Sequence, residues 1–344
     1  MKYISFTIPA YNSQDYMRHV IDNLVAVGED IEVLIVNDGS KDDTGKIADE
    51  YQVKYPTIVK AIHKENGGHG SGVMVGIRNA TGIFYKVVDS DDWVETEDVI
   101  KMLDLIKKHM QEGLDIDLYI TNYVYEHASD GSKYVMHYRK CLPVDKAFTW
   151  EEMRHVKLET VFLMHSLMYR LDKLKASGTE LPNHTFYVDD IYAYIPLPYM
   201  DKVFYHDLDF YHYFIGRGDQ SINYSIMCKR YEQQMRVFRI MFTRYSLEEL
   251  KKLPKPLYKY MFHFLMIIGA ITIMTTLGTK EDKEVRRQAY NEYWNELKEI
   301  DIKLFKKFRR TLPGFLGFGI PSYNIRSFAS RKIYGMYQRR LKLG

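Results

Sequence analysis

The first 100 residues alternate between short apolar segments and segments with helical spacing, and this alternation restricts the possible folds more than any other feature. The expected strands are residues 3–8, which stop at Pro9, and residues 31–36, 58–62 and 83–88. Helical spacing follows at 13–24, where Ser13 is the expected cap, and at 44–51 and 73–79. A β-α-β-α order joins parallel strands through right-handed crossovers. We therefore predict an α/β fold with a Rossmann-like, mostly parallel sheet flanked by helices.

A polar loop follows each of the four expected strands. The loops are residues 9–12 (PAYN), 37–40 (NDGS), 66–72 (NGGHGSG) and 89–92 (DSDD). Open parallel sheets bind their ligands beyond the carboxyl ends of the strands. Because all four loops belong to that edge of the sheet, we expect them to converge on one crevice.

The acidic residues of the last loop indicate a cation site. Asp89 and Asp91 are one residue apart in a turn that directly follows an apolar strand. Mg²⁺ binds proteins through one or two carboxylates together with substrate phosphates. The pair therefore suits a hard divalent cation, although the same four residues would also serve as the start of a helix.

The remaining short motifs argue against several other kinds of binding site. Gly70, Gly72 and Gly76 form a variant of a dinucleotide-binding fingerprint, but they follow the third expected strand rather than the first, so a nicotinamide or flavin enzyme is not expected. The sequence contains no GxxxxGK[ST] phosphate-binding loop. The two cysteines, Cys141 and Cys228, lack CxxC spacing, which argues against a zinc site or a disulfide framework.

Five ordered motifs carry a family resemblance. They are IPAYN at 8–12, VNDGSxDxT at 36–44, NGG at 66–68, RNATG at 78–82 and DSDD at 89–92. In this order and spacing they resemble the family 2 glycosyltransferases of the GT-A fold, closely over residues 3–100 and more loosely to about residue 225. The resemblance implies a metal-assisted, inverting transfer of a sugar from a UDP-sugar donor to a hydroxyl group.

The same resemblance implies roles for individual residues. Tyr11 would stack on the nucleobase, Asp38 would accept a hydrogen bond from the N3–H of uracil, and Arg78 would lie near the donor phosphates or sugar. The residues expected to bind the nucleotide-sugar are Pro9, Ala10, Tyr11, Asn12, Asp38, Asn66, Gly67, Arg78, Asp89, Ser90 and Arg217. The expected ligands of Mn²⁺ or Mg²⁺ are Asp91, Asp89 and His212.

A downstream acidic pair is the candidate for the catalytic base. By the resemblance, Asp190 would take the proton of the acceptor hydroxyl, with Asp189 as the second candidate. Burial and a neighbouring carboxylate both raise a carboxyl pKa, and this suits a base that works near neutral pH. The alternative is that both residues only stabilise the start of a helix.

Two other classes of function remain open. A nucleotidyltransferase also uses an α/β sheet, a metal and nucleotides, but the loop after the first strand lacks the glycine-rich, basic sequence that such an enzyme needs. A catalytically inactive sugar-binding or scaffold subunit is the second alternative. The presence of Asp38, Asp89, Asp91 and Asp190 argues against it, because an inactive relative would be expected to have lost at least one of them.

The pattern becomes helical after residue 230. We predict a catalytic domain at 1–230 and a helical C-terminal region at 231–344. Residues 261–277 are the most apolar run, at 17 residues. A membrane-spanning helix usually needs about 20 residues, so the run is either a buried bundle helix or a membrane-embedded one.

The end of the chain is strongly basic. Residues 301–344 hold eleven Lys and Arg and one acidic residue, interleaved with Phe and Leu. This mixture suits an anionic membrane surface, and it would fit a glycan or lipid-linked acceptor in cell-envelope polysaccharide synthesis. The alternative is a solvated basic face on a packed helix. The chain opens without a signal peptide, so we expect a cytoplasmic protein, either free or peripheral on the inner face of the cell membrane, with no nucleic-acid partner.

Overall fold

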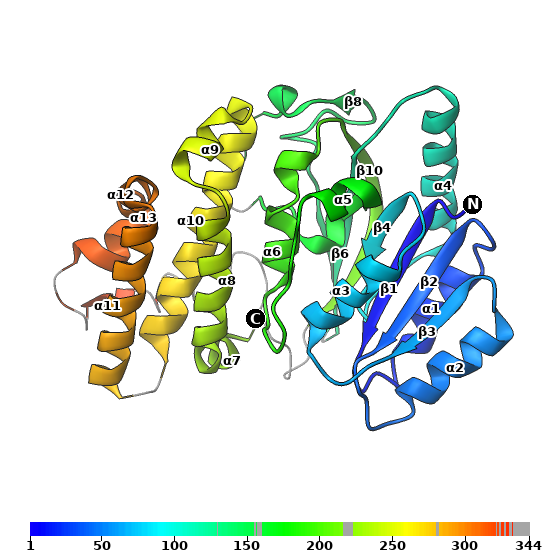
Figure 1. Cartoon of the computed structure of the whole chain (residues 1–344), viewed down its shortest axis with the longest axis horizontal. Helices are drawn as coiled ribbons and strands as arrows, with labels where there is room; N and C mark the ends of the chain where they lie inside the picture. The colour runs from blue at the N-terminus through cyan, green and yellow to red at the C-terminus, as the bar shows by residue number, and fades with distance from the viewer. Residues whose placement is uncertain are drawn as a thin grey trace. The chain divides into compact units, whose positions relative to one another are not determined.

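The computed structural model describes residues 1–128, 130–154, 156, 160–215, 223–279 and 282–320, and residues 322, 325, 326, 328, 329 and 332 beyond them. The chain forms two compact units, Met1–Phe214 and Ile215–Gly344 (Figure 1). The domain boundary that the sequence suggests near residue 230 stays a prediction.

A mixed sheet forms the centre of the first unit, and the fold is the expected α/β arrangement. Its strands occur in the order β3-β2-β1-β4-β9-β6-β10-β5, with β7 paired to β6 and β8 paired to β10. Pairing is parallel from β3 to β4, and β9 then runs antiparallel to both β4 and β6. The strands are β1 (Ile4–Ala10), β2 (Ile31–Asn37), β3 (Val59–His63), β4 (Phe84–Val87), β5 (Trp93–Val94), β6 (Leu118–His127), β7 (Lys133–Met136), β8 (Ala147–Phe148), β9 (Leu167–Arg170) and β10 (Val203–Ile215).

The first strand extends further than the sequence predicts. We expected it to stop at Pro9, yet β1 continues to Ala10, and Pro9 pairs in register with Val36. Residues of a parallel strand face its two neighbours alternately. The Ala10 carbonyl faces β2, where it accepts from Asp38 N, so the missing N–H of Pro9 belongs to the β4 side. The pairing with β4 ends at Val87, opposite Thr7, where an N–H at position 9 would be needed to continue it.

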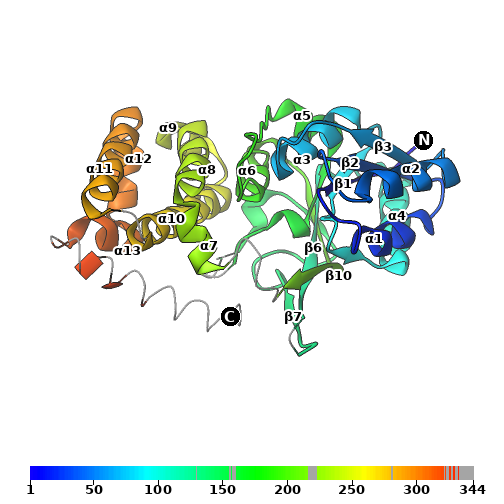
Figure 2. The same cartoon turned by 90° about the horizontal axis from the view of Figure 1, so that it is seen from below.

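Helices cover both faces of this sheet (Figure 2). The chain runs from β1 through β2 to β3 at the edge of the sheet and then returns to the other side of β1 to form β4. Because the direction of travel reverses, right-handed crossovers place α3 on the face opposite α1 and α2. The helices of the unit are α1 (Met17–Val25), α2 (Thr44–Lys54), α3 (His69–Asn79), α4 (Thr96–Gln111), α5 (Leu171–Ala176) and α6 (Asp189–Tyr194), with 3-10 turns at Trp150–Glu152, Met164–Ser166 and Leu197–Tyr199. The reversal creates a topological switch point between β1 and β4, where ligands bind in open α/β sheets.

The start of α1 corrects another expectation. The helix begins at Met17 rather than after Ser13, and no side chain caps it. The Ser13 hydroxyl instead lies 2.7 Å from the Ser90 hydroxyl, and Ser13 N donates to Thr44 Oγ1. A residue whose polar groups are bonded to distant loops is not available to cap its own helix. Further along the chain, β6 and β7 pair as an antiparallel hairpin.

The second unit is helical, as expected from the pattern after residue 230. Its helices are α7 (Tyr224–Lys229), α8 (Tyr231–Arg244), α9 (Leu247–Lys252), α10 (Lys255–Gly278), α11 (Lys283–Ile300), α12 (Ile302–Arg309) and α13 (Leu312–Gly314), with a π-helical turn at Phe315–Gly319. An aromatic core joins them: the Trp294 ring stacks on Phe308 and contacts Phe238. Gly269 of α10 allows this core to close, because a Cβ there would lie 2.5 Å from the Phe308 ring.

The apolar run 261–277 forms most of α10. Among the described residues this helix alone is long and apolar enough to cross a membrane, with a mean hydropathy of 1.8 over its best 18-residue window. Within the second unit α10 packs against α7, α8, α9 and α13, and 56% of that window is buried in the protein. The packing favours a bundle helix, and membrane insertion stays a prediction.

We predict that Gly76→Ala destabilises the first unit. A Cβ at Gly76 would lie 2.3 Å from Thr7 Oγ1 and 2.6 Å from the Tyr85 hydroxyl, and both neighbours are fully buried. Overpacking of this kind costs about 1–3 kcal/mol. Urea denaturation would measure it, with the exposed Arg78→Ala on the same helix as the control expected to change stability by less than about 0.5 kcal/mol. Equal stability of the two variants would show that α3 can shift away from β1.

Candidate functional site

The four polar loops converge as predicted, and hydrogen bonds join them in a closed ring. Each loop is bonded to two others, so none of them is free to move alone. The bonds are Asn12 N to Ser40 Oγ (3.0 Å), Gly68 N to Asp38 Oδ2 (2.7 Å), His69 Nε2 to Asp89 Oδ1 (2.8 Å) and Ser13 Oγ to Ser90 Oγ (2.7 Å). The ring lies at the carboxyl ends of β3, β2, β1 and β4, and it includes the switch point between β1 and β4.

Asp38 organises the glycine loop from the end of β2. Its carboxylate is buried and accepts hydrogen bonds from Gly67 N at 2.9 Å, from Gly68 N at 2.7 Å and from Lys64 Nζ at 2.5 Å. Gly68 adopts φ +83°, a conformation that a side chain would strain, and this turns both amides toward Asp38. A carboxylate has about four acceptor positions, so one remains for a donor outside the chain.

The loop after β4 is supported by Tyr211 of β10. The Tyr211 hydroxyl donates to Asp92 Oδ2 at 2.6 Å and accepts from Asp89 N at 3.1 Å. Asp92 Oδ1 accepts from Phe214 N, so both Asp92 oxygens are bonded to the chain. Burial, together with the charges of Asp91 and Asp89, raises the pKa of Asp92 well above its usual value. Asp92 thus has a structural role that its position in the DSDD motif does not reveal.

His69 and Asp89 form a charged pair at the centre of the ring. Burial alone would lower the pKa of His69, but the charge and hydrogen bond of Asp89, with the charges of Asp189 and Asp91, outweigh it and raise that pKa. Burial alone would raise the pKa of Asp89, and His69 is the main reason that it is lowered instead. The pair therefore favours a protonated His69 facing an ionised Asp89.

The two candidates for the catalytic base, Asp189 and Asp190, lie beside this ring. Helix α6 begins at Asp189, and the segment before it contacts the glycine loop, where His184 N donates to Gly67 O at 2.6 Å. The charge of Asp189 is close enough to act on His69 and Asp89. Burial, and then the charge of Asp189, raise the pKa of Asp190 well above its usual value. Both residues occupy a helix start, as the alternative interpretation also expects, but this start faces the ring.

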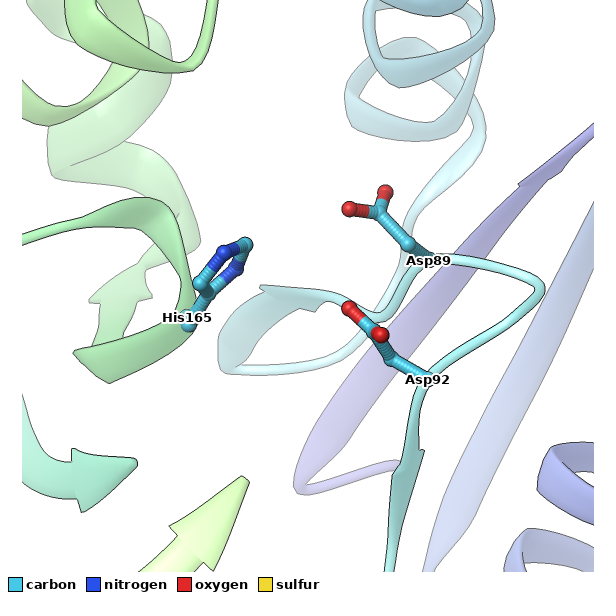
Figure 3. Close-up of side chains that lie close together, drawn as sticks. All are labelled: Asp89, Asp92 and His165. Carbon is cyan, nitrogen blue, oxygen red and sulfur yellow. The ribbon is translucent and has the colours of Figure 1, made fainter. Parts of the chain in front are cut away.

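His165 adds a nitrogen that the sequence did not indicate. Its ring is buried, and its Nδ1 has no hydrogen-bond partner among the described residues. Asp89, Asp92 and His165 each offer one ligand atom, and these atoms lie within 4.8 Å of one another (Figure 3). Burial lowers the pKa of His165 to about 4, so the ring is neutral at pH 7 and has a lone pair to offer. Carboxylate oxygens and a neutral imidazole suit Mn²⁺ or Mg²⁺.

A buried lysine lies behind the acidic loop. Lys86 of β4 is fully buried, and its Nζ donates to His165 O at 2.7 Å and Leu167 O at 3.4 Å. The Tyr211 ring lies 5.2 Å from the same Nζ. Burial lowers the pKa of Lys86 to about 7, while the charge of Asp89 opposes this shift. At neutral pH the amine is therefore about half protonated, and its charged form adds positive charge near Asp89 from inside the sheet.

The loop after β1 presents one exposed ring. Pro9 and Ala10 are buried at the end of the strand, whereas Tyr11 is 50% exposed. Asn12 adopts φ +50°, and its Oδ1 accepts from Lys41 N at 2.9 Å. The loop is thus held to the loop after β2 while Tyr11 stays accessible for stacking on a ligand.

Asn66 also belongs to the ring. Its Nδ2 donates to Asp38 O at 2.9 Å. The bond joins the glycine loop to the backbone of the loop after β2, in addition to the contacts of the Asp38 carboxylate.

Two expected site residues, Arg78 and His212, are not part of this cluster. Arg78 lies in the last turn of α3, whose first turn carries His69, and its guanidinium is 3.4 Å from the exposed Glu180. Nine residues of helix span about 14 Å, which separates Arg78 from the ring. The His212 ring stacks on Trp93, and its Nδ1 lies 2.8 Å from Glu126. Arg217 is outside the described residues.

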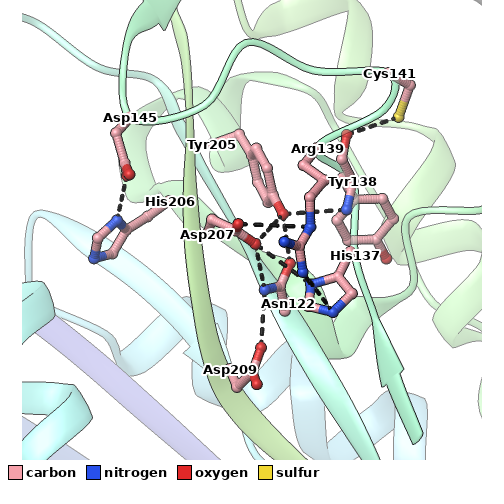
Figure 4. A network of polar contacts seen from close by, with 10 residues as sticks. All are labelled: Asn122, His137, Tyr138, Arg139, Cys141, Asp145, Tyr205, His206, Asp207 and Asp209. Atoms are coloured by element: carbon pink, nitrogen blue, oxygen red, sulfur yellow. Dashed lines mark hydrogen bonds and ion pairs between the residues drawn. The ribbon is translucent and has the colours of Figure 1, made fainter.

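A second polar cluster lies between β6 and β10 (Figure 4). Asn122 Nδ2 donates to Asp207 at 2.8 Å and Asp209 at 2.9 Å, and the Tyr205 hydroxyl lies 2.6 Å from Asn122 Oδ1. Arg139 adds an ion pair to Asp207. Its members pair with one another, so the cluster serves to join two strands.

His69, His165, Lys86 and Tyr211 are functional candidates that sequence reasoning missed. His69 stands inside the NGGHG motif, and its position directly after the paired glycines was an available signal. His165 and Tyr211 are 76 and 122 residues from Asp89 along the chain, and nothing in their surroundings marks them. Lys86 stands in the strand expected at residues 83–88, and the structure shows that this polar residue is buried there.

Comparison with known proteins identifies relatives of this arrangement. Residues 5–169 match the sequence profile described as glycosyl transferase family 2. The glycosyltransferase GlyG of Streptococcus pneumoniae is 33% identical over 133 residues, which cover 38% of this chain and 42% of that protein. An uncharacterized Rickettsia prowazekii glycosyltransferase, RP339, is 30% identical over 167 residues, covering 48% of each. The aligned segments span less than half the length of these curated relatives.

Solved structures are similar over a larger part of the chain. TarS of S. aureus, residues 1–349 in complex with UDP-GlcNAc, gives a TM-score of 0.63 at 18% identity and covers 98% of this chain and 92% of that one. The mannosyltransferase PcManGT of Pyrobaculum calidifontis, in complex with GDP-Man and Mn²⁺, gives 0.53 at 12% identity, covering 95% and 86%. At such low identity these similarities establish the fold, which is the GT-A fold followed by a helical region.

We predict that Tyr211→Phe destabilises the protein by about 1–3 kcal/mol. Loss of the hydroxyl leaves the buried Asp92 Oδ2 without its donor and Asp89 N without its acceptor, and unsatisfied buried polar groups cost this much. Denaturant unfolding measures the change. Tyr134→Phe, at a 44% exposed position on β7, is the matched control and should be neutral. Equal stability of the two variants would contradict the supporting role of Tyr211.

Proposed function

We propose that the protein transfers a sugar from a nucleotide-sugar donor to an acceptor hydroxyl, because residues 5–169 match the sequence profile of glycosyl transferase family 2. The observation that carries the proposal is the closed ring of four loops at the switch point, which contains Asp38 and Asp89 and has Asp189 close enough to interact with Asp89. Such a ring would bring together three parts of a transferase site. They are a site for the nucleobase, a cation that neutralises the phosphates, and a catalytic base.

The donor proposed is a UDP-sugar. The exposed Tyr11 ring stacks on the base, and Asp38 accepts the uracil N3–H at its remaining acceptor position. The fold alone does not determine which nucleobase is bound, because TarS holds UDP-GlcNAc and PcManGT holds GDP-Man. Selection would therefore depend on Asp38, whose carboxylate is held by two backbone amides.

A divalent cation is proposed at the acidic loop. Asp91 and Asp89 would hold Mn²⁺ or Mg²⁺, which supplies a Lewis acid that neutralises charge on phosphoryl oxygens. The unpartnered nitrogen of His165 makes that residue a better third ligand than His212, whose ring is already bonded to Glu126. The lowered pKa of Asp89 keeps it ionised for this role.

The chemical step proposed is a single inverting displacement. Asp190 removes the proton from the acceptor hydroxyl as its oxygen forms a bond to the anomeric carbon. The bond between that carbon and the diphosphate oxygen breaks on the opposite face. Protonated His69 adds positive charge beside the departing phosphates. One carboxylate suffices, because a nucleoside diphosphate leaves without the acid that a hydrolase needs.

The acceptor proposed is a glycan or a lipid-linked saccharide of the cell envelope. The basic residues of 301–344 support a location at the inner face of the membrane, where such acceptors are built. Residues 333–344 of this tail lie outside the described part of the chain.

We predict metal-dependent donor binding and hydrolysis. Thermal-shift and hydrolysis assays with UDP-, GDP-, dTDP- and CMP-sugars, with and without Mn²⁺, should give a response to UDP-sugars that requires the cation. Asp91→Ala should remove the response, because it deletes a cation ligand, while leaving the unfolding midpoint without ligand unchanged. No response of wild type to any nucleotide would favour the inactive sugar-binding alternative.

We predict that the two acidic residues of α6 differ in their effect on transfer. Asp190→Asn should lower the transfer rate by a factor of about 10²–10⁴, the usual contribution of a general base, with donor binding retained. Its raised pKa places the acidic limb of the pH–rate profile above the usual range of Asp, and activity is lost as pH falls through that limb.

Asp189→Asn is the control in the same helix turn. The negative charge of Asp189 raises the pKa of Asp190, so its removal should move the acidic limb to lower pH and leave most of the activity. The reverse result, with Asp189→Asn inactive and Asp190→Asn active with a displaced limb, would assign the base to Asp189.

A further inference from the structure

The second unit contains a basic groove that has no part in the proposed reaction. Its volume is about 530 Å³, and it opens between α9, α10 and α12. Eight residues line it, and five of them are cationic: Leu247, Lys251, Phe262, Lys303, Lys306, Lys307, Arg310 and Thr311. We call these residues the basic groove.

The register of α12 explains why the cations gather on one side. The buried residues Leu304, Phe305 and Phe308 form one face of the helix and pack into the aromatic core. At 100° per residue, positions 303, 306, 307 and 310 fall on the opposite face. The same amphipathic pattern that fixes the helix therefore lines the groove with four positive charges.

Few acidic groups neutralise these charges. Glu248 forms ion pairs with two of them, because its Oε1 lies 3.1 Å from Lys303 Nζ and 3.5 Å from Lys251 Nζ. Lys306, Lys307 and Arg310 have no ion-pair partner within the described part of the chain. Positive charges held close together repel one another unless an anion joins them.

One of these cations is held in place by aromatic rings. Lys307 Nζ lies 4.6 Å from the centroid of Phe262 and 5.5 Å from that of Tyr258. Cation–π contacts fix the position of the ammonium group without neutralising it. Phe262 and Leu247 also give the groove an apolar part, so its lining offers positive charge and apolar contact together.

We propose that the basic groove binds a phosphate ester carrying two or more negative charges. Lys306, Lys307 and Arg310 would contact the phosphate oxygens, and Arg310 offers the planar fork that recognises them in pairs. The groove is larger than a phosphate ion needs, and pockets of this size hold small organic ligands. The organic part of the ester would lie against Phe262 and Leu247.

Two sources supply this chemistry, a soluble phosphorylated metabolite and the headgroup of an anionic phospholipid. Exposed apolar side chains follow the groove directly in the chain, with Leu312 69% exposed and Phe315 57% exposed. This neighbourhood favours a headgroup, because such side chains can enter the interfacial layer while the cations hold the phosphate. The inference does not depend on the proposed transferase activity.

Calorimetric titration of the full chain tests the proposal. The probes are sodium pyrophosphate, glycerol 3-phosphate, and phosphatidylcholine vesicles with and without phosphatidylglycerol, all without divalent cations. We expect saturable binding of at least one phosphate probe, weakened roughly tenfold or more in Lys306→Glu/Arg310→Glu because two charge-assisted contacts are lost. Binding that requires phosphatidylglycerol assigns the groove to lipid, and binding of the small esters alone assigns it to a metabolite.

A charge-matched variant provides the control. Lys229→Glu/Lys298→Glu changes the net charge equally at exposed positions of α7 and α11, outside the groove, and should bind as wild type does. Equal weakening in both double variants, or no binding by wild type, would overturn the proposal. If the charge-reversed groove variant does not fold, Lys306→Gln/Arg310→Gln replaces it. Asp38→Ala should leave this binding unchanged, and so separates it from the nucleotide site.

Discussion

The hydrogen bonds that Asp38 accepts from Gly67 and Gly68 organise the candidate site. They attach the glycine loop to the end of β2, and so they determine where α3 begins. His69 is the first residue of that helix, and its ring reaches Asp89 across the switch point. A buried carboxylate needs hydrogen-bond donors, and those that Asp38 finds in the glycine loop connect three loops through one side chain.

Buried charge is the second constraint on the site. Asp92 and Lys86 are buried and lie near the partly exposed pair of Asp89 and His69, and isolated charges are costly where water is scarce. The pairing of Asp89 with His69 and the position of Lys86 beneath the loop offset the negative charges. Asp92 and Asp190 both have strongly raised pKa values, but their surroundings differ. Asp92 is bonded to Tyr211 and to the backbone, whereas Asp190 lies at a helix start beside the ring.

Much of this could be predicted from residues 1–100 because the signals there are local. The strand and helix spacing predicted the sheet, and the position of each loop after a strand predicted the ring. The failures have local reasons as well. Ser13 resembled a helix cap but is bonded to Ser90 and Thr44, and Pro9 resembled a strand end although it stays in register with Val36 of β2.

The sequence by itself determined the α/β class, the four loops and the acidic residues at their ends, because these depend on periodicity and on residues adjacent in the chain. Only the tertiary structure decided which side chains meet. His165 and Tyr211 reach the Asp89 loop from β9 and β10 regions far along the chain, Arg78 is carried away by the length of α3, and four cations of α12 face one groove. Side-chain partners across a sheet depend on strand order and register, and no local pattern encodes them.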